Sequence, residues 1–215
     1  MKDVILIDAG TGNLRSVQKA LESVGANVER TDDPHALRRV LSGKRVVLPG
    51  VGAFGDFMSG LRARGLEDAV KDVVKRGVPL LGICVGMQAL FDIGEEMGEH
   101  KGLGLLPGKV LKFDESLSVK IPHTGWNQVE VKKARVEPGR NEALLFEQVN
   151  AGAYVYFNHS YYCQPWNSSD VLATTDYGIN YACAVRRENI YGVQFHPEKS
   201  QAVGLQILKN FVEAT

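Results

Sequence analysis

Short, wholly apolar segments alternate with helical patterns along the first two-thirds of the chain. Three such segments, at residues 4–7, 46–48 and 80–83, have the length and composition of strands buried on both faces. Apolar residues recur at helical spacing across residues 14–24 and from about 54 to 75. Strands that alternate with helices are typical of parallel βαβ units with right-handed crossovers. This part of the chain therefore predicts a parallel sheet with helices packed on its faces.

The pattern changes after about Gly108, where strand-like segments follow one another directly. They lie at residues 128–131, 154–157, 171–175, 182–185 and 190–195, with polar or Gly-rich turns between them. A helix with one apolar face closes the chain at residues 203–212. We therefore predict an α/β fold with a mixed, largely parallel central sheet flanked by helices, and antiparallel strands added in the C-terminal third. No repeat or linker interrupts the sequence, so we expect residues 1–215 to form one domain.

Charge and cysteine usage narrow the classes of function. Lys plus Arg number 25 and Asp plus Glu number 25, without a basic cluster, which argues against nucleic acid or an anionic membrane as the main partner. Three cysteines without paired spacing favour a reducing compartment. The first apolar run is too short for a signal peptide or a membrane span, so we expect a cytoplasmic protein. No two histidines have metal-ligand spacing, and we expect neither a metal nor a cofactor.

Cys84 is the candidate nucleophile. It stands in the segment GICVG, after an apolar run and before a helical pattern that reaches about residue 91. This is the cysteine form of the strand-turn-helix elbow of serine hydrolases, in which flanking glycines allow the backbone to pack closely. The N-terminus of the following helix favours a thiolate, and the N–H of Val85 is suited to an oxyanion hole. A buried core cysteine is the alternative, and it is the interpretation we prefer for Cys163 and Cys183.

His196 and Glu198 are the candidate base and its orienting carboxylate. They end the last strand-like segment in the sequence QFHPE, and an extended backbone would point both side chains to the same side. A carboxylate beside an imidazole fixes its tautomer and stabilises the imidazolium. Cys84, His196 and Glu198 together match a cysteine-based triad whose members meet only in space. A solvated His-Pro-Glu turn is the alternative interpretation.

The segment GVGAFG at residues 50–55 matches the dinucleotide-binding pattern G-x-G-x-x-G literally. An NAD-dependent oxidoreductase is nevertheless disfavoured, because the pattern belongs on the first strand of its unit, with an acidic residue ending the next strand. Here the next strand ends at Cys84. We expect instead that this segment approaches the cysteine elbow and that Gly52 supplies the second oxyanion N–H.

With these residues in place, the chain resembles the class I (triad-type) glutamine amidotransferases. The segments GICVGMQ and QFHPEKS look like the two signatures of that family, in the expected order and separation. The resemblance implies that Cys84 attacks the side-chain amide of glutamine, that His196 moves the protons, and that Glu198 orients His196. It further implies that Gln88, Ser160 and Tyr161 bind the substrate, with ammonia and glutamate as products.

Further segments resemble one branch of this family over essentially the whole chain. They are DAGTGNLRSV, LPGVGAFGDFMSGL, PHTGWNQV and YFNHSYYC. The resemblance implies a heterodimer with a cyclase subunit of (β/α)₈ barrel fold that receives the ammonia. Asn13 and Trp126 match interface positions of that branch, whereas Thr124 departs from it, because a bulkier apolar residue is expected there.

Three rival functions remain open at this point. The first is a glutaminase that feeds another synthase, such as the one for pyridoxal phosphate or anthranilate. The second is a cysteine hydrolase or peptidase that needs no partner. The third is a non-catalytic binding module, in which replacing Cys84 would change no activity.

Overall fold

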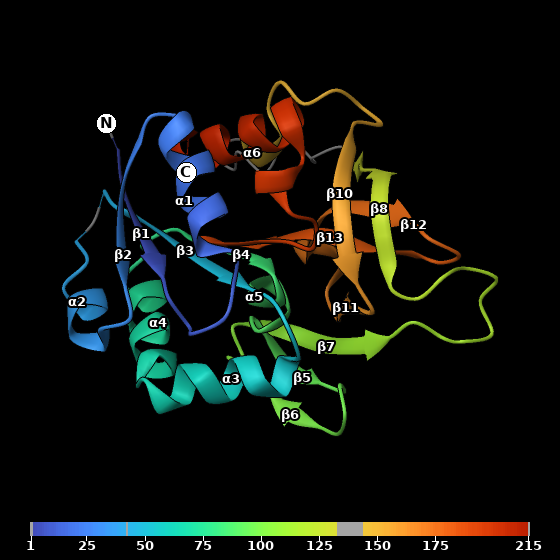
Figure 1. The fold of residues 1–215 in the computed structure, drawn as a ribbon, viewed down its shortest axis with the longest axis horizontal. Helices are drawn as coiled ribbons and strands as arrows, with labels where there is room; N and C mark the ends of the chain where they lie inside the picture. Colours follow the sequence, from blue (N-terminus) through green and yellow to red (C-terminus); the bar gives the residue numbers. More distant parts are fainter. Residues whose placement is uncertain (1, 42, 133–143, 215) are drawn as a thin grey trace.

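One large sheet runs through the molecule and joins strands from both ends of the chain (Figure 1). The computed structural model describes residues 2–41, 43–132 and 144–214. Neighbouring strands follow the order β2-β1-β3-β4-β14-β13-β11-β7-β5-β6, and β12 pairs with β13 and β9. Their bounds are β1 (Lys2–Ile7), β2 (Ala26–Thr31), β3 (Arg45–Gly50), β4 (Leu80–Cys84), β5 (Phe91–Gly94), β6 (His100–Lys101), β7 (Leu106–Lys112), β9 (Glu130–Val131), β11 (Tyr161–Pro165), β12 (Val171–Asp176), β13 (Asn180–Arg187) and β14 (Ile190–Val193). A separate two-stranded sheet pairs β8 (His123–Gln128) with β10 (Tyr154–His159).

Strand direction divides the large sheet into two parts, with one difference from the prediction: β14, expected among the added antiparallel strands, runs parallel to β4. The neighbours from β2 to β14 run parallel to one another. The pairs β14–β13, β13–β11 and β11–β7 are antiparallel. Because β14 lies beside β4, the strand before His196 and the strand that carries Cys84 are neighbours. The predicted mixed α/β fold is confirmed, and its topology places both candidate segments at the carboxyl ends of adjacent parallel strands.

Helices cover both faces of the parallel half (Figure 1). The helices α1 (Leu14–Ser23) and α6 (Gln201–Ala214) lie on one face, and α2 (Pro34–Arg38), α3 (Phe54–Ala63) and α4 (Leu66–Lys75) lie on the other. The helical pattern at 54–75 is divided because Gly65 adopts a left-handed conformation with φ 66°. Short 3₁₀ turns complete the described elements: η1 (Leu144–Phe146), η2 (Ser168–Asp170) and η3 (Pro197–Lys199).

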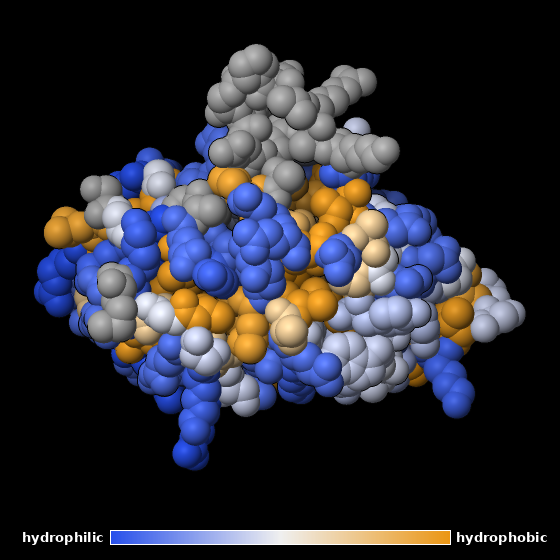
Figure 2. Space-filling view, turned by 90° about the horizontal axis from the view of Figure 1, so that it is seen from above, coloured by the Kyte–Doolittle hydropathy of each residue, from blue (hydrophilic) through white to orange (hydrophobic). Residues whose placement is uncertain are grey.

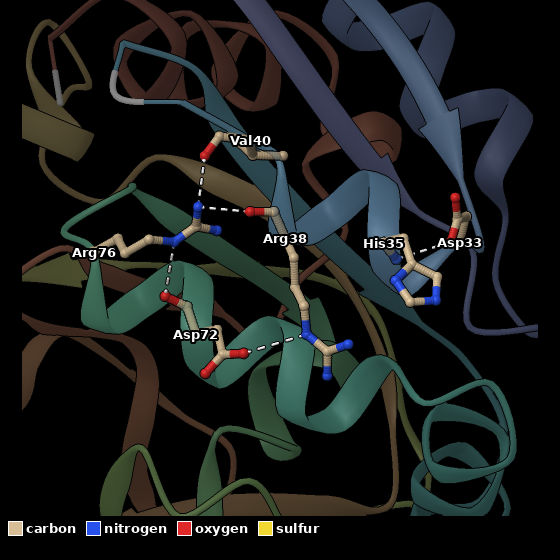
Figure 3. Close-up of polar contacts among 6 residues, drawn as sticks. All are labelled: Asp33, His35, Arg38, Val40, Asp72 and Arg76. Atoms are coloured by element: carbon tan, nitrogen blue, oxygen red, sulfur yellow. Dashed lines mark hydrogen bonds and ion pairs between the residues drawn. The ribbon is translucent and has the colours of Figure 1, made fainter.

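The short helix α2 is tied to α4 by side-chain contacts (Figure 3). The Arg76 guanidinium donates to the carbonyls of Arg38 and Val40 at 2.7 and 3.1 Å. Arg38 in turn pairs with Asp72 at 3.3 Å, although both side chains are largely solvated, so this pair adds little stability. The contacts of Arg76 with the two carbonyls contribute more to stability, because they satisfy backbone acceptors where α2 ends.

Two sequence predictions about individual elements are wrong, and some strands were not predicted. The helix expected up to about residue 91 is only four residues long, α5 (Val85–Gln88), and β5 begins at Phe91. The carbonyls of Ala89 and Leu90 accept hydrogen bonds from Leu103 and Leu106 at 2.8 and 2.9 Å, so the chain pairs with this segment and the helix stops. The strand expected at 128–131 is broken into the end of β8 and the short β9. The strands β2 and β7 were not predicted, because each carries charged or polar residues within its run.

The surface mixes apolar and charged residues. In the face seen from above, which carries α1 and α6, hydrophobic residues reach the surface between hydrophilic ones (Figure 2). No helix in the described ranges is long and apolar enough to cross a bilayer.

Candidate active site

Cys84 occupies a strained turn between β4 and α5. Its dihedrals are φ 56° and ψ −114°, a conformation that costs a non-glycine residue about 1–3 kcal/mol. Close packing keeps the flanking residues small. A Cβ on Gly82 would lie 2.5 Å from the carbonyl oxygen of Gly86, and a Cβ on Gly86 would collide with the carbonyl oxygen of Leu48. The predicted sharp elbow with two obligatory glycines is confirmed, and it presents the sulfur at the N-terminus of α5.

His196 and Glu198 are in direct contact, but not by the route that the sequence predicted. The Glu198 carboxylate accepts from His196 Nδ1 at 2.9 Å, with side chains only 5% and 1% exposed. His196 has an extended backbone, as expected before a proline, whereas Pro197 starts the 3₁₀ turn η3 that contains Glu198. The expectation of an extended His-Pro-Glu segment is therefore wrong. The turn, closed by Lys199 N–H donating to the His196 carbonyl at 3.0 Å, brings the carboxylate back to the ring.

The backbone of His196 is anchored on both sides. Its N–H donates to the Tyr156 carbonyl on β10 at 2.8 Å, and its own carbonyl accepts from the Ser200 hydroxyl at 2.7 Å. The Ser200 oxygen also accepts from the Tyr156 N–H at 3.0 Å. These bonds fix the ring position relative to β10 before any substrate binds.

The imidazole of His196 is held as a cation. Burial acts to lower its pKa, but hydrogen bonds and charge from Cys84 and Glu198 together raise the pKa to about 10. At neutral pH, His196 is therefore an imidazolium between sulfur and carboxylate. The second carboxylate oxygen, Glu198 Oε2, is buried without a hydrogen-bond partner among the described residues. The three side chains that the sequence singled out converge at one edge of the sheet.

The expected oxyanion donors lie beside the elbow. Gly50 pairs with Cys84 across β3 and β4, so the following segment borders the sulfur's turn. Gly52 is exposed with φ 90°, and nothing lies within 4 Å of where its Cβ would be. Val85 is the first residue of α5, so its N–H has no acceptor within the helix. The role of Gly52 and Val85 as donors stays a prediction.

Gln88 is the last residue of α5, and it contacts the segment that is expected to bind the substrate. Its Nε2 donates to the Tyr161 carbonyl at 3.0 Å and to Gln194 Oε1 at 3.2 Å. Ser160 lies in the bend between β10 and β11, and its carbonyl accepts from Phe113 N–H at 3.2 Å. The structure thus brings Gln88 and Tyr161 together next to Cys84, while their binding of substrate stays a prediction.

Gln194 also reaches the site, and the sequence analysis assigned it no role. It is fully buried, and its amide Nε2 donates to Cys84 Sγ at 3.8 Å. One signal in the sequence pointed to it. Gln194 stands two residues before His196 at the end of a strand, so both side chains leave the same face.

The two expected interface residues are both exposed. Asn13 precedes α1 and makes no side-chain capping bond. Trp126 on β8 is 46% exposed, and its ring lies edge-on to Tyr156, with centroids 6.0 Å apart. Thr124, which differs from the bulkier apolar residue expected at its position, donates to Asn158 on the neighbouring strand at 3.1 Å. Because the Tyr156 backbone anchors His196, the exposed indole lies one residue away from the candidate site.

Comparison with known proteins relates this geometry to a family. The family model described as glutamine amidotransferase class-I matches residues 5–215. The imidazole glycerol phosphate synthase subunit HisH of Salinibacter ruber is 50% identical over 211 residues, covering 96% of this chain and 92% of that protein. The subunit of the same name from Moorella thermoacetica is 48% identical over 213 residues, covering 99% and 95%.

Solved structures share the fold at lower identity. A glutamine amidotransferase crystal structure superposes with a TM-score of 0.70 at 21% identity, covering 96% of this chain and 98% of that one. PurLQS from Thermotoga maritima gives a TM-score of 0.68 at 20% identity, covering 98% and 96%. These similarities concern the arrangement of the sheet and helices alone.

Proposed function

Because the chain belongs to the class-I glutamine amidotransferase family, we propose that it is the glutaminase subunit of an imidazole glycerol phosphate synthase. In this role it hydrolyses glutamine to glutamate and ammonia. The ammonia passes to a cyclase subunit of (β/α)₈ barrel fold, which forms imidazole glycerol phosphate and an aminoimidazole carboxamide ribonucleotide in histidine biosynthesis. The observation that carries the proposal is the buried contact of His196 with Glu198 at 2.9 Å beside the strained Cys84 elbow.

In the proposed first half-reaction, the Cys84 sulfur attacks the amide carbon of glutamine. The developing oxyanion is stabilised by the N–H groups of Val85 and Gly52. His196 is already an imidazolium, so it can protonate the amide nitrogen, which leaves as neutral ammonia when the C–N bond breaks and the glutamyl thioester forms.

In the second half-reaction, His196 removes a proton from water, which attacks the thioester and releases glutamate. Glu198 keeps Nδ1 protonated, so that Nε2 faces the reacting atoms. Gln88 donates to the Tyr161 carbonyl, which links the proposed substrate-binding segment to the cysteine elbow.

A partner subunit has a physical purpose here. Ammonia that escapes into water at neutral pH is largely protonated and no longer nucleophilic, so a shielded path to the acceptor prevents its loss. The exposed Trp126 and Asn13 support docking beside the site. Docking would also order the Gly52 peptide and complete the oxyanion hole only when the acceptor is present.

Two cysteine variants test the proposal. Cys84→Ser in the complex should abolish glutamine-dependent synthesis and leave ammonia-dependent synthesis intact. Cys183→Ser is the matched control, because that thiol is fully buried in β13 and burial raises its pKa. Loss of ammonia-dependent synthesis in Cys84→Ser would make Cys84 structural. Cleavage of peptides or esters by the isolated chain, without ammonia release from glutamine, would support the partner-free hydrolase instead.

A further inference from the structure

The buried amide of Gln194 bridges two groups of the site. Its Nε2 donates to Cys84 Sγ at 3.8 Å, and its Oε1 accepts from Gln88 Nε2 at 3.2 Å. The same oxygen faces the thiol of Cys163 at 4.0 Å. Its backbone N–H donates to the Cys183 carbonyl at 2.9 Å, which fixes the residue at the end of β14. Gln194 contacts one member of the triad, Cys84, but is not itself a member of it.

The direction of the Gln194 amide is determined by its neighbours. Gln88 Nε2 faces the Tyr161 carbonyl at 3.0 Å, and a carbonyl oxygen only accepts, so this atom of Gln88 must be the nitrogen. Its second hydrogen then requires an acceptor, which is Gln194 Oε1. The opposite end of the Gln194 amide, facing Cys84, is therefore the NH₂ group. An N–H directed at sulfur favours the thiolate over the thiol.

The Tyr161 carbonyl is itself held by a buried chain of hydrogen bonds. His159 Nδ1 lies 2.8 Å from it and must donate, which leaves His159 Nε2 as an acceptor for the Tyr181 hydroxyl at 3.0 Å. The Tyr181 oxygen then accepts from His123 Nδ1 at 2.9 Å. Burial lowers the pKa of His123 to about 4 and that of His159 to about 3, so both rings are neutral and this tautomer assignment holds at physiological pH.

This series of hydrogen bonds begins on β8, the strand that carries Trp126. Asn127 Nδ2 lies 3.4 Å from His123 Nε2, and Asn127 Oδ1 accepts from the Gln128 N–H at 2.8 Å, which fixes which end of this amide donates. Donors therefore run in one direction from β8 through the histidines and Tyr181 to the Tyr161 carbonyl. Gln88 also donates to this carbonyl, and it donates to Gln194 Oε1 as well.

We propose that Gln194 is a positioning residue, whose amide holds the Cys84 sulfur and the Gln88 side chain in fixed relative places. The buried series of hydrogen bonds from Asn127 to Tyr161 fixes the Tyr161 carbonyl, to which Gln88 also donates. This inference rests on the proposed glutaminase function and adds to it a group that sets thiolate stability and substrate placement together. The amide does not exchange protons with the substrate.

Two variants separate the two contacts. Gln194→Glu keeps an oxygen for Gln88 but removes the N–H that faces sulfur, so kcat for glutamine hydrolysis in the complex should fall about tenfold to a hundredfold while KM changes little. Gln194→Met has a similar length but neither polar atom, so KM should rise as well. Gln206→Met is the matched control, because its amide bonds Asn210 on α6, away from the site. It should keep both constants within about twofold of the wild type.

A second readout distinguishes positioning from loss of structure. At a fixed neutral pH, the rate of Cys84 alkylation by iodoacetamide should fall about tenfold in both Gln194 variants, because the thiolate is the species that reacts. Cys163 is buried and burial raises its pKa well above the usual range, so that thiol does not contribute to the labelling.

A variant and a matched control test the buried series of hydrogen bonds from Asn127 to Tyr161. Tyr181→Phe removes the hydroxyl that links His123 to His159 and should raise KM several-fold. Tyr177→Phe removes a hydroxyl from the same aromatic cluster, but that hydroxyl donates to the Lys120 carbonyl at 2.7 Å and should leave KM unchanged.

The inference is overturned if both Gln194 variants, folded and bound to the partner, keep the wild-type kcat, KM and rate of Cys84 alkylation. It is also overturned if Gln206→Met loses as much activity as they do. Failure of the proposed function looks different. In that case, the wild-type complex would not hydrolyse glutamine, or Cys84→Ser would hydrolyse it as fast as the wild type, whatever the Gln194 variants do.

Discussion

Replacing Glu198 by glutamine removes one charge from the site and little volume. The carboxylate contacts His196 Nδ1 at 2.9 Å, and its side chain is only 1% exposed, so solvent hardly screens the interaction. The glutamine oxygen can still accept from Nδ1–H and keep the ring in place. The variant therefore separates the charge of Glu198 from its geometry.

The magnitude follows from the contact. A hydrogen bond to a charged group contributes about 1.5–3 kcal/mol, which corresponds to about 1–2 units of pKa. The pKa of His196, about 10 in the wild type, should then fall to about 8–9. Between the two pKa values, at about pH 9–10, we expect kcat/KM for glutamine to drop about tenfold or more relative to the wild type, because less imidazolium is available to protonate the leaving amide nitrogen.

The assay is glutamate formation by the complex as a function of pH. The alkaline limb of kcat should lie near pH 10 in the wild type and should move about 1–2 units lower in Glu198→Gln. Glu213→Gln, at the exposed end of α6, is the matched control and should leave the profile unchanged. An unchanged alkaline limb in Glu198→Gln, with normal folding and partner binding, would refute a contribution of this carboxylate to the raised pKa of His196.

Three further predictions concern stability and docking. Gly86→Ala would place a Cβ against the Leu48 carbonyl and should lower the free energy of unfolding by about 1–3 kcal/mol, measured by urea titration; an unchanged midpoint would contradict the close packing. The pKa of His196 is raised on folding, so its stabilising contribution is complete below its unfolded pKa of about 6.5 and is lost as the pH rises through about 10. The urea midpoint should therefore fall across that window more in the wild type than in His196→Gln, and equal slopes would argue against a charged ring. Trp126→Ala should weaken partner binding by about tenfold or more in a titration, whereas Trp166→Ala, which removes a 62% exposed indole, should not; equal affinities would remove Trp126 from the interface.

The sequence alone determined features that depend on residues close together along the chain. Short apolar runs without charge favour buried strands, so β1, β3 and β4 were predictable from residues 4–7, 46–48 and 80–83. The elbow around Cys84 was predictable for the same reason, because two glycines at fixed spacing permit a backbone approach that a Cβ forbids. The candidate residues His196 and Glu198 also followed from their spacing around a proline.

Other features depended on partners distant along the chain. The short α5 ends because Leu103 and Leu106 take the carbonyls of Ala89 and Leu90, and no local signal specifies that pairing. The 3₁₀ turn that brings Glu198 to His196 is held partly by Ser200, which also bonds Tyr156 on β10.

The buried amide of Gln194 shows the same limit most clearly. Its contacts with Cys84 and Gln88 span 110 and 106 residues of sequence. Composition and periodicity encode which residues are buried and in which element they lie. The direction in which a buried polar group donates is decided only by its neighbours in the folded sheet, because each one must supply an acceptor or a donor to the next.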